Sequence, residues 1–249
     1  MSYFYVVKKT FESKIFYFKE MFLDNISLVF SGLFAIFIGI YLNNVNPVFS
    51  SLNELLIYYF FGNGILNLFQ RGNVVREIER DVINGNLNVH FVKPYDFIVF
   101  KLVKYYTHKL FKVIINISIF FILINMFQAT FMPLDMVLRA ILIIPAAIIF
   151  MILNTSVFCF LSLMIEKIGR LHQTYGMLGY FIGGGLVSAK YFPNFIKFLP
   201  QYFYFGAPLE YILNGVFENF GLFIIYTIIL IVLNLVVRKI VYSRLETNG

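Results

Sequence analysis

The sequence is poor in charge. Only 13 % of its 249 residues are Asp, Glu, Lys or Arg, whereas soluble domains carry roughly 25 %. Apolar residues make up 60 % of the chain and the mean hydropathy is +0.80. Too little polar side chain is available to cover a water-facing surface. These shortages argue against a soluble domain and predict an all-α protein embedded in a membrane.

Several motifs of catalytic and metal-binding sites are also missing. Cys159 is the single cysteine, which excludes an intramolecular disulfide, and we interpret it as a small buried hydrophobe. His90, His108 and His172 are scattered, with no H-E-x-x-H motif and no Cys pair, so we predict no metal site. No G-x-x-x-x-G-K-[ST] motif occurs, so this chain is not expected to bind nucleotide in the P-loop manner.

The basic residues are concentrated in four blocks. Seventeen of the 20 Lys and Arg residues lie in residues 8–19, 71–112, 167–170 and 238–244. Short loops rich in Lys and Arg stay on the cytoplasmic side of a membrane, so these blocks predict cytoplasmic loops and cytoplasmic termini. The net charge of +7 could suggest nucleic acid. However, the basic residues adjoin apolar runs, where anionic lipid head groups would meet them. We therefore expect a lipid bilayer and no nucleic acid.

The apolar runs predict six transmembrane helices, since a bilayer core needs roughly 20 helical residues. The predicted spans are residues 26–42, 55–69, 110–127, 136–165, 171–188 and 220–237. This number leaves every basic block inside and only Arg139, Lys190 and Lys197 outside. Five or seven spans would move at least one basic block to the outer side.

Three segments flank the spans. Residues 1–25 alternate aromatic and charged side chains and predict an interfacial helix on the cytoplasmic leaflet, with an ordinary basic flank as the alternative. Residues 26–249 would then form a single six-span domain. Residues 43–53 contain Pro47 and no basic residue, so we expect this loop outside. Residues 191–220 are apolar but interrupted by prolines, which predicts an outer re-entrant or interfacial hairpin before the last span.

Small residues recur at helical spacing on two predicted spans. Ala35 and Gly39 lie on the first span, and Gly176, Gly179 and Gly183 lie on the fifth. Such spacings predict close helix packing, and the alternative is a substrate path or a seam between subunits.

The predicted cytoplasmic segment contains a short amphipathic helix at residues 73–83. Gly72–Asn73 and Asn84–Gly85 supply its start and stop signals. Its apolar stripe consists of Val74, Val75, Ile78, Val82 and Ile83. Its charged face consists of Arg76, Glu77, Glu79, Arg80 and Asp81, in which Arg76/Glu79 and Glu77/Arg80 have i, i+3 spacing. The pattern fits a helix that docks into a partner's groove, and it equally fits a helix on its own membrane surface.

Two stretches resemble the permeases of ABC type-2 transporters. Residues 75–87 read VREIERDVINGNL and residues 92–95 read VKPY. They resemble the amphipathic helix, the "Gly-Glu/Asn-Leu" turn and the "Arg/Lys-Pro" step that follow the second span in that family. Asn86 stands where the acidic residue of the turn is common. The prolines between Phe192 and Gly215 resemble the family's stretch before the last span.

The resemblance implies the function. This chain would be the transmembrane permease subunit of an ABC exporter, not itself an enzyme, in a prokaryotic plasma membrane. A second permease, identical or homologous, would complete a path for an amphipathic or lipid-like substrate. Two ABC ATPase subunits would bind ATP and Mg, with no cofactor on this chain. They would dock on the coupling helix through its five charged residues, Arg76, Glu77, Glu79, Arg80 and Asp81.

Two other functions compete with this prediction. An ion-coupled carrier or channel usually needs ionisable groups inside the bundle, but Glu54, Lys112 and Arg139 all lie near span ends. A membrane-embedded lipid-processing enzyme needs clustered catalytic groups. Glu210 with Lys190 and Lys197 is the candidate cluster for that function.

Overall fold

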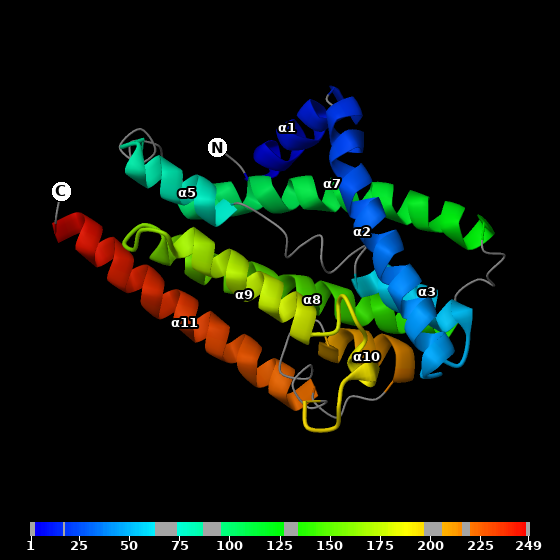
Figure 1. Cartoon of the computed structure of the whole chain (residues 1–249). Coiled ribbons are helices and arrows are strands. Elements are labelled where there is room, and N and C mark those ends of the chain that lie inside the picture. Colours follow the sequence, from blue (N-terminus) through cyan, green and yellow to red (C-terminus); the bar gives the residue numbers. More distant parts are fainter. Residues whose placement is uncertain are drawn as a thin grey trace.

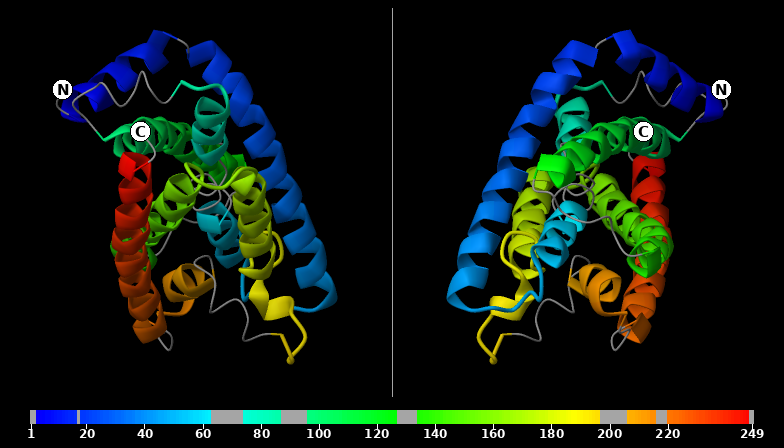
Figure 2. Two further views of the ribbon diagram at one scale, coloured as in Figure 1. Left: turned by 90° about the vertical axis from the view of Figure 1, so that its left-hand side faces the viewer. Right: turned by 90° about the vertical axis from the view of Figure 1, so that its right-hand side faces the viewer.

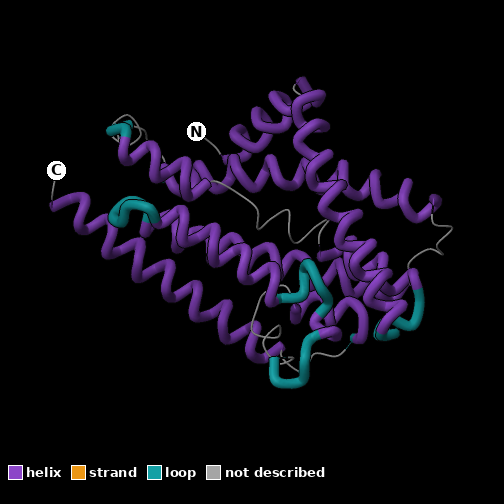
Figure 3. The backbone as a smooth tube through the Cα atoms, in the orientation of Figure 1, coloured by secondary structure: helices purple, strands orange, loops and turns teal. Residues whose placement is uncertain are grey.

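The computed structural model describes residues 3–16, 18–62, 74–86, 96–126, 134–196, 206–215 and 220–247. This part of the chain is helical, with connecting turns and no strand (Figure 3). The helices are α1 (Tyr3–Phe16), α2 (Phe18–Val45), α3 (Leu52–Tyr59), α5 (Val74–Ile83), α7 (Phe97–Met126), α8 (Leu134–Leu161), α9 (Ile168–Ile182), the 3-10 helix η2 (Ala189–Tyr191), α10 (Gly206–Asn214) and α11 (Phe220–Thr247). The prediction of an all-α chain is confirmed for these residues.

The long helices run between two ends of the molecule. The two termini and α5 lie toward one end, whereas α3 and α10 lie toward the other (Figures 1 and 2). α9 runs from the region of α5 towards the loop that leads into η2 (Figure 1). Residues from the N-terminal, middle and C-terminal basic blocks are therefore gathered at one end.

α8 lies at the centre of the packing and contacts α5, α7, α9, α10 and α11. Its buried residues include Ala147 and Cys159, both fully buried, so Cys159 is the buried hydrophobe that the sequence predicts. Pro145 lies inside this helix, which nevertheless continues from Leu134 to Leu161. Asn234 of α11 donates its amide to the carbonyl of Leu153 at 2.9 Å and so ties α11 to α8.

Two of the helices are long and apolar enough to cross a membrane. Leu134–Leu161 has a mean hydropathy of 2.7 over its best window, and Gly221–Arg244 has 2.4. Only 6 % of the window in Gly221–Arg244 is buried inside the molecule. Apolar surface of this extent is unfavourable in water. These two helices therefore favour a membrane protein, and they fall within or overlap the predicted fourth and sixth spans.

Two helix boundaries differ from the predicted ones. α1 ends at Phe16 and α2 begins at Phe18, so the predicted helix over residues 1–25 is divided between them. Val6 and Thr10 of α1 are buried and α1 packs on α7. After Tyr59, α3 continues as a π-helical turn to residue 62. The rest of the predicted second span, residues 63–69, lies outside the described residues.

α9 ends at Ile182, six residues before the predicted end of the fifth span. Gly184 has a φ of 86°, which favours glycine, and the chain turns there. The amide of Gly185 donates to the carbonyl of Tyr180 at 2.8 Å and closes the turn. The apolar run continues past this point, but the consecutive glycines end the helix.

Candidate functional site

The helix α5 ends as its sequence predicts. Gly85 has a φ of 70° and its amide donates to Val82 at 3.0 Å. The amide of Asn86 donates to the carbonyl of Asp81 at 2.9 Å. Together these bonds form a Schellman motif, which satisfies the last carbonyls of a helix. The predicted start signal, Gly72–Asn73, lies outside the described residues.

Most of the apolar stripe of α5 packs against other helices of the same chain. Val74, Val75 and Ile78 are at most 1 % exposed and belong to the main hydrophobic core, and Val82 packs partly buried against it. α5 contacts α7, α8 and α9. These four residues therefore face the core of their own chain and not a membrane surface. Ile83 departs from the stripe, since it is 63 % exposed.

Glu79 faces the start of α9. Its Oε1 accepts a hydrogen bond from the backbone amide of Lys167 at 2.8 Å, and its Oε2 accepts one from Gly169 at 3.1 Å. Lys167 is the N-cap of α9 and supplies no capping side chain. A carboxylate at this position accepts hydrogen bonds from amides that have no partner inside the helix. Its negative charge also interacts favourably with the positive end of the helix dipole. Within the described helix, no ion pair joins Glu79 to Arg76.

Asp81 binds a different neighbour. Its Oδ2 lies 2.7 Å from Nζ of Lys101 in α7, and both side chains are only 20 % exposed. The ammonium of Lys101 also lies 5.5 Å from the ring centroid of Phe97. Two of the five charged residues predicted to face an ATPase therefore hold α5 to its own chain.

The remaining charged residues of α5 differ in exposure. Arg76 is half-buried, and a Cβ at Gly169 would lie 2.7 Å from its Cγ. Glu77 and Arg80 are exposed, and the exposed Ile83 and Asn84 follow them at the end of the helix. An exposed acidic group, an exposed basic group and an exposed aliphatic side chain thus lie on a helix that is held to its own chain. We call Glu77, Arg80 and Ile83 the docking face.

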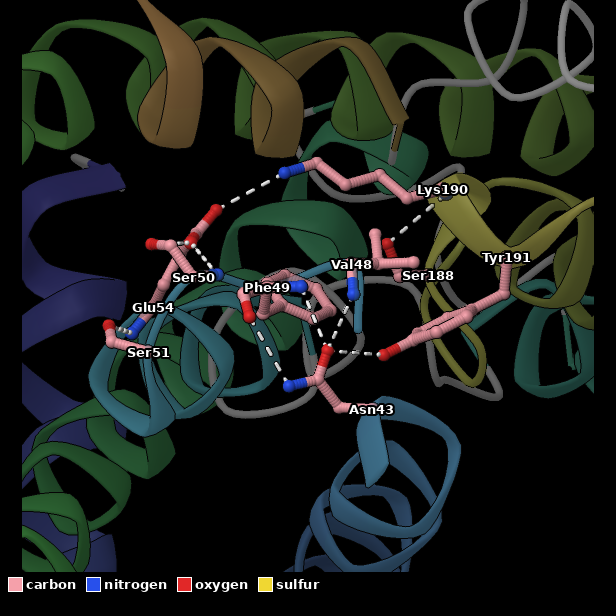
Figure 4. A network of polar contacts seen from close by, with 9 residues as sticks. All are labelled: Asn43, Val48, Phe49, Ser50, Ser51, Glu54, Ser188, Lys190 and Tyr191. Atoms are coloured by element: carbon pink, nitrogen blue, oxygen red, sulfur yellow. Dashed lines mark hydrogen bonds and ion pairs between the residues drawn. The ribbon is translucent and has the colours of Figure 1, made fainter. Parts of the chain in front are cut away.

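A second polar cluster lies at the opposite end of the molecule. Oδ1 of Asn43, at the end of α2, accepts hydrogen bonds from the amides of Val48 and Phe49, both at 2.8 Å (Figure 4). The same oxygen accepts a hydrogen bond from the hydroxyl of Tyr191 at 3.1 Å (Figure 4). Asn43 thus joins the loop after α2 to the segment after α9.

Glu54 makes the second connection between these loops. Its Oε1 lies 3.1 Å from Nζ of Lys190, and its Oε2 accepts hydrogen bonds from the Ser50 hydroxyl at 2.7 Å and amide at 2.9 Å (Figure 4). Burial acts to raise the pKa of Glu54, but the hydrogen bonds from Ser50 and Lys190 outweigh it and hold this pKa below its ordinary value. We call Asn43, Glu54, Lys190 and Tyr191 the loop clasp. Sequence reasoning singled out neither connection, because the partners lie more than 130 residues apart.

Those histidines and members of the candidate enzyme cluster that the structure describes are spread over several elements. Among the described residues, no group of three or more His, Cys, Asp and Glu side chains could hold a metal ion. His172 is buried with its ring 4.9 Å from that of Phe158. Lys190, a member of the candidate enzyme cluster, is paired with Glu54, and Lys197 lies outside the described residues. Glu210 is half-buried in α10.

Comparison with known proteins gave no match to a protein-family model, to a curated protein or to a solved structure.

Proposed function

We propose that this chain is the permease subunit of an ABC type-2 exporter. It would cross a prokaryotic plasma membrane six times and pair with a second permease, identical or homologous. Two ATPase subunits, which bind ATP and Mg, would drive transport of an amphipathic or lipid-like substrate. The observation that carries this proposal is the form of α5, a braced helix whose exposed residues combine opposite charges with one aliphatic side chain.

The arrangement of the ends supports an even number of spans. Both termini lie at the same end as α5, as cytoplasmic termini and a cytoplasmic coupling helix require (Figure 2). α2 has 28 residues and α7 has 30. At 1.5 Å per residue, such helices are roughly 40 to 45 Å long, enough for a hydrocarbon core of about 30 Å. These two helices would be the first and third spans.

Contacts at the ends of α2, α3 and α9 support a substrate path lined by the first, second and fifth spans. The hydroxyl of Tyr58 in α3 donates to the carbonyl of Gly184 after α9 at 2.6 Å. Asn43 at the end of α2 binds Tyr191 in the same segment. The ends of α2, α3 and α9 are thus joined. Large apolar side chains such as Phe34 and Phe37 on α2 are exposed, which suits contact with lipid, a lipid-like substrate or a second permease.

The test is to purify the tagged chain gently from its native membrane and to identify its partners by mass spectrometry. We expect a stoichiometric partner with a G-x-x-x-x-G-K-[ST] motif, and ATPase activity in the complex. The double variant Glu77→Lys with Arg80→Glu should lose this partner, because both charges of the docking face are reversed. Reversal of Lys8 and Glu12, an exposed pair on α1 at 4.0 Å, is the matched control and should keep it.

Two results would contradict the proposal in different ways. If no ATPase accompanies the wild-type chain in several detergents, the transporter assignment fails. If the double variant keeps its full share of ATPase, the transporter assignment stands but the docking face is wrong.

A further inference from the structure

The first turn of α9 depends on a residue from another helix. Lys167, its N-cap, has a φ of 65° and makes no capping hydrogen bond with its own side chain. A helix start has four amides without partners inside the helix, and a polar side chain usually satisfies one of them. Here the two acceptors come from Glu79, which lies 88 and 90 residues earlier in the chain.

The bonds from Glu79 fix α5 against α9 with little freedom. One carboxylate accepts from two amides at 2.8 and 3.1 Å, so both the position and the rotation of its plane are defined. The helices also approach closely here. A Cβ at Gly169 would lie 2.5 Å from Oε2 of Glu79, 2.7 Å from Cγ of Arg76 and 3.3 Å from Cα of Arg76, so an alanine there would require these two residues to shift.

The opposite end of α9 is also held. The turn after Ile182 accepts a hydrogen bond from Tyr58 at the carbonyl of Gly184, and the clasp residues Lys190 and Tyr191 follow. α9 has 15 residues, which makes it roughly 22 Å long. It therefore connects α5 at one end of the molecule to the turn that leads into the loop clasp at the other (Figure 1).

We propose that Glu79 is the residue that makes α5 and α9 move as one body. A displacement of α5 would be passed through Glu79 to the first turn of α9 and along α9 to the loop clasp. Asp81, through Lys101, would pass the same displacement to α7. Glu79 and Asp81 are thereby assigned to transmission within the chain, and the docking face is reduced to Glu77, Arg80 and Ile83. The source of the displacement, an ATPase, rests on the proposed function, but the connection itself does not.

The connection can be tested on the purified chain alone. In a Cys159→Ser background, spin labels at Ile83→Cys on α5 and Leu171→Cys on α9, both exposed, report the distance between the two helices. We expect a narrow distribution in this background, and a broader one when Glu79→Ala or Gly169→Ala is added. Glu79→Gln keeps one acceptor oxygen and should give an intermediate width. Glu77→Gln, on the same helix but exposed, is the matched control and should change nothing.

Hydrogen exchange supplies a second readout that needs no label. The amide of Gly169 should exchange about tenfold faster in Glu79→Ala than in the wild type or Glu77→Gln, because it loses its acceptor. A distance distribution and an exchange rate equal to the wild-type values in Glu79→Ala would overturn the connection. If Glu79→Ala does not fold, Glu79→Gln and Gly169→Ala answer the same question.

Transmission is tested in the complex with the ATPase subunit. A spin label at Leu171 or at Met177 on α9 is paired with a spin label on the ATPase partner. The distance between the two labels should change when a non-hydrolysable ATP analogue is added. Glu79→Ala should keep the partner but lose this change. If Glu79→Ala responds to the analogue as the wild type does, Glu79 does not transmit. If the wild type binds no ATPase, the proposed function fails, whereas the connection is still judged by the distances and the exchange rates.

Discussion

Nζ of Lys190 lies 3.1 Å from Oε1 of Glu54, although the two residues are 136 positions apart. The pair joins the start of α3 to the segment that follows α9. Their side chains are 25 % and 16 % exposed, so water only partly screens the interaction. At the other end of α9, Glu79 binds the amides of Lys167 and Gly169. One carboxylate thus binds the start of α9, and another binds the segment that follows its end.

Breaking the Glu54–Lys190 pair should destabilise the protein. We expect Lys190→Met to lower the free energy of unfolding by about 1 to 2 kcal/mol, because it leaves a half-buried carboxylate without its cation. Denaturant-induced unfolding in detergent, followed by circular dichroism, measures this change. Lys8→Met on α1 is the control. Its side chain is 66 % exposed and 4.0 Å from Glu12, so its loss should cost under about 0.5 kcal/mol. Equal effects of the two substitutions would contradict the clasp.

The contribution of Glu54 should depend on pH in one direction. The pKa of Glu54 is lowered by folding, so its contribution is present above the ordinary value of 4.5 and is lost as the pH falls through the lower folded value. The wild type should therefore exceed Glu54→Gln in thermal midpoint by a constant amount from about pH 7 to pH 5. This difference should shrink below pH 4.5. A difference that grows on acidification would mean that the pKa is raised instead.

Signals from neighbouring residues in the sequence correctly predicted two helices. The helix over residues 73–83 agrees with α5, Val74–Ile83, because an amphipathic stripe and the Asn84–Gly85 stop signal both depend on neighbouring residues. The fourth span over residues 136–165 agrees with most of α8 for a similar reason, since its apolar run is long and carries no charge after Arg139.

The connections between elements could not be predicted in the same way. All five charged residues of α5 were predicted to face an ATPase, because nothing near Glu79 or Asp81 in the sequence indicates that Gly169 and Lys101 bind them. Hydropathy also misplaced the end of α9, since the residues after Gly183 remain apolar while the backbone turns at Gly184. A long-range contact leaves no periodic trace in a single sequence, whereas a helix does.

Replacing two glycines of α2 with alanine should change stability by different amounts. A Cβ at Gly39 would lie 2.9 Å from Cζ of Tyr59, whose ring is 1 % exposed and has little room to move. Gly39→Ala should therefore lower the free energy of unfolding by about 1 to 3 kcal/mol, as expected for an overpacked contact. A Cβ at Gly32 would meet nothing within 4 Å, so Gly32→Ala should cost nothing. Unfolding in detergent compares the two variants. A tolerated alanine at Gly39 would mean that α2 and α3 pack less closely than the structure shows.

The predicted topology places the loop after α2 and the end of α5 on opposite sides of the membrane. Asn46 and Asn84 are exposed at these two sites, and each can carry a single cysteine in a Cys159→Ser background. In intact cells, a membrane-impermeant maleimide should label Asn46→Cys, whereas Asn84→Cys should react only after permeabilisation. The Cys159→Ser chain itself should remain unlabelled throughout. Residues 55–69 are the one predicted crossing between the two sites, so labelling from the same side would mean that they do not cross. If both cysteines react in intact cells, the docking face is not cytoplasmic, and if neither reacts, the loop after α2 is not outside.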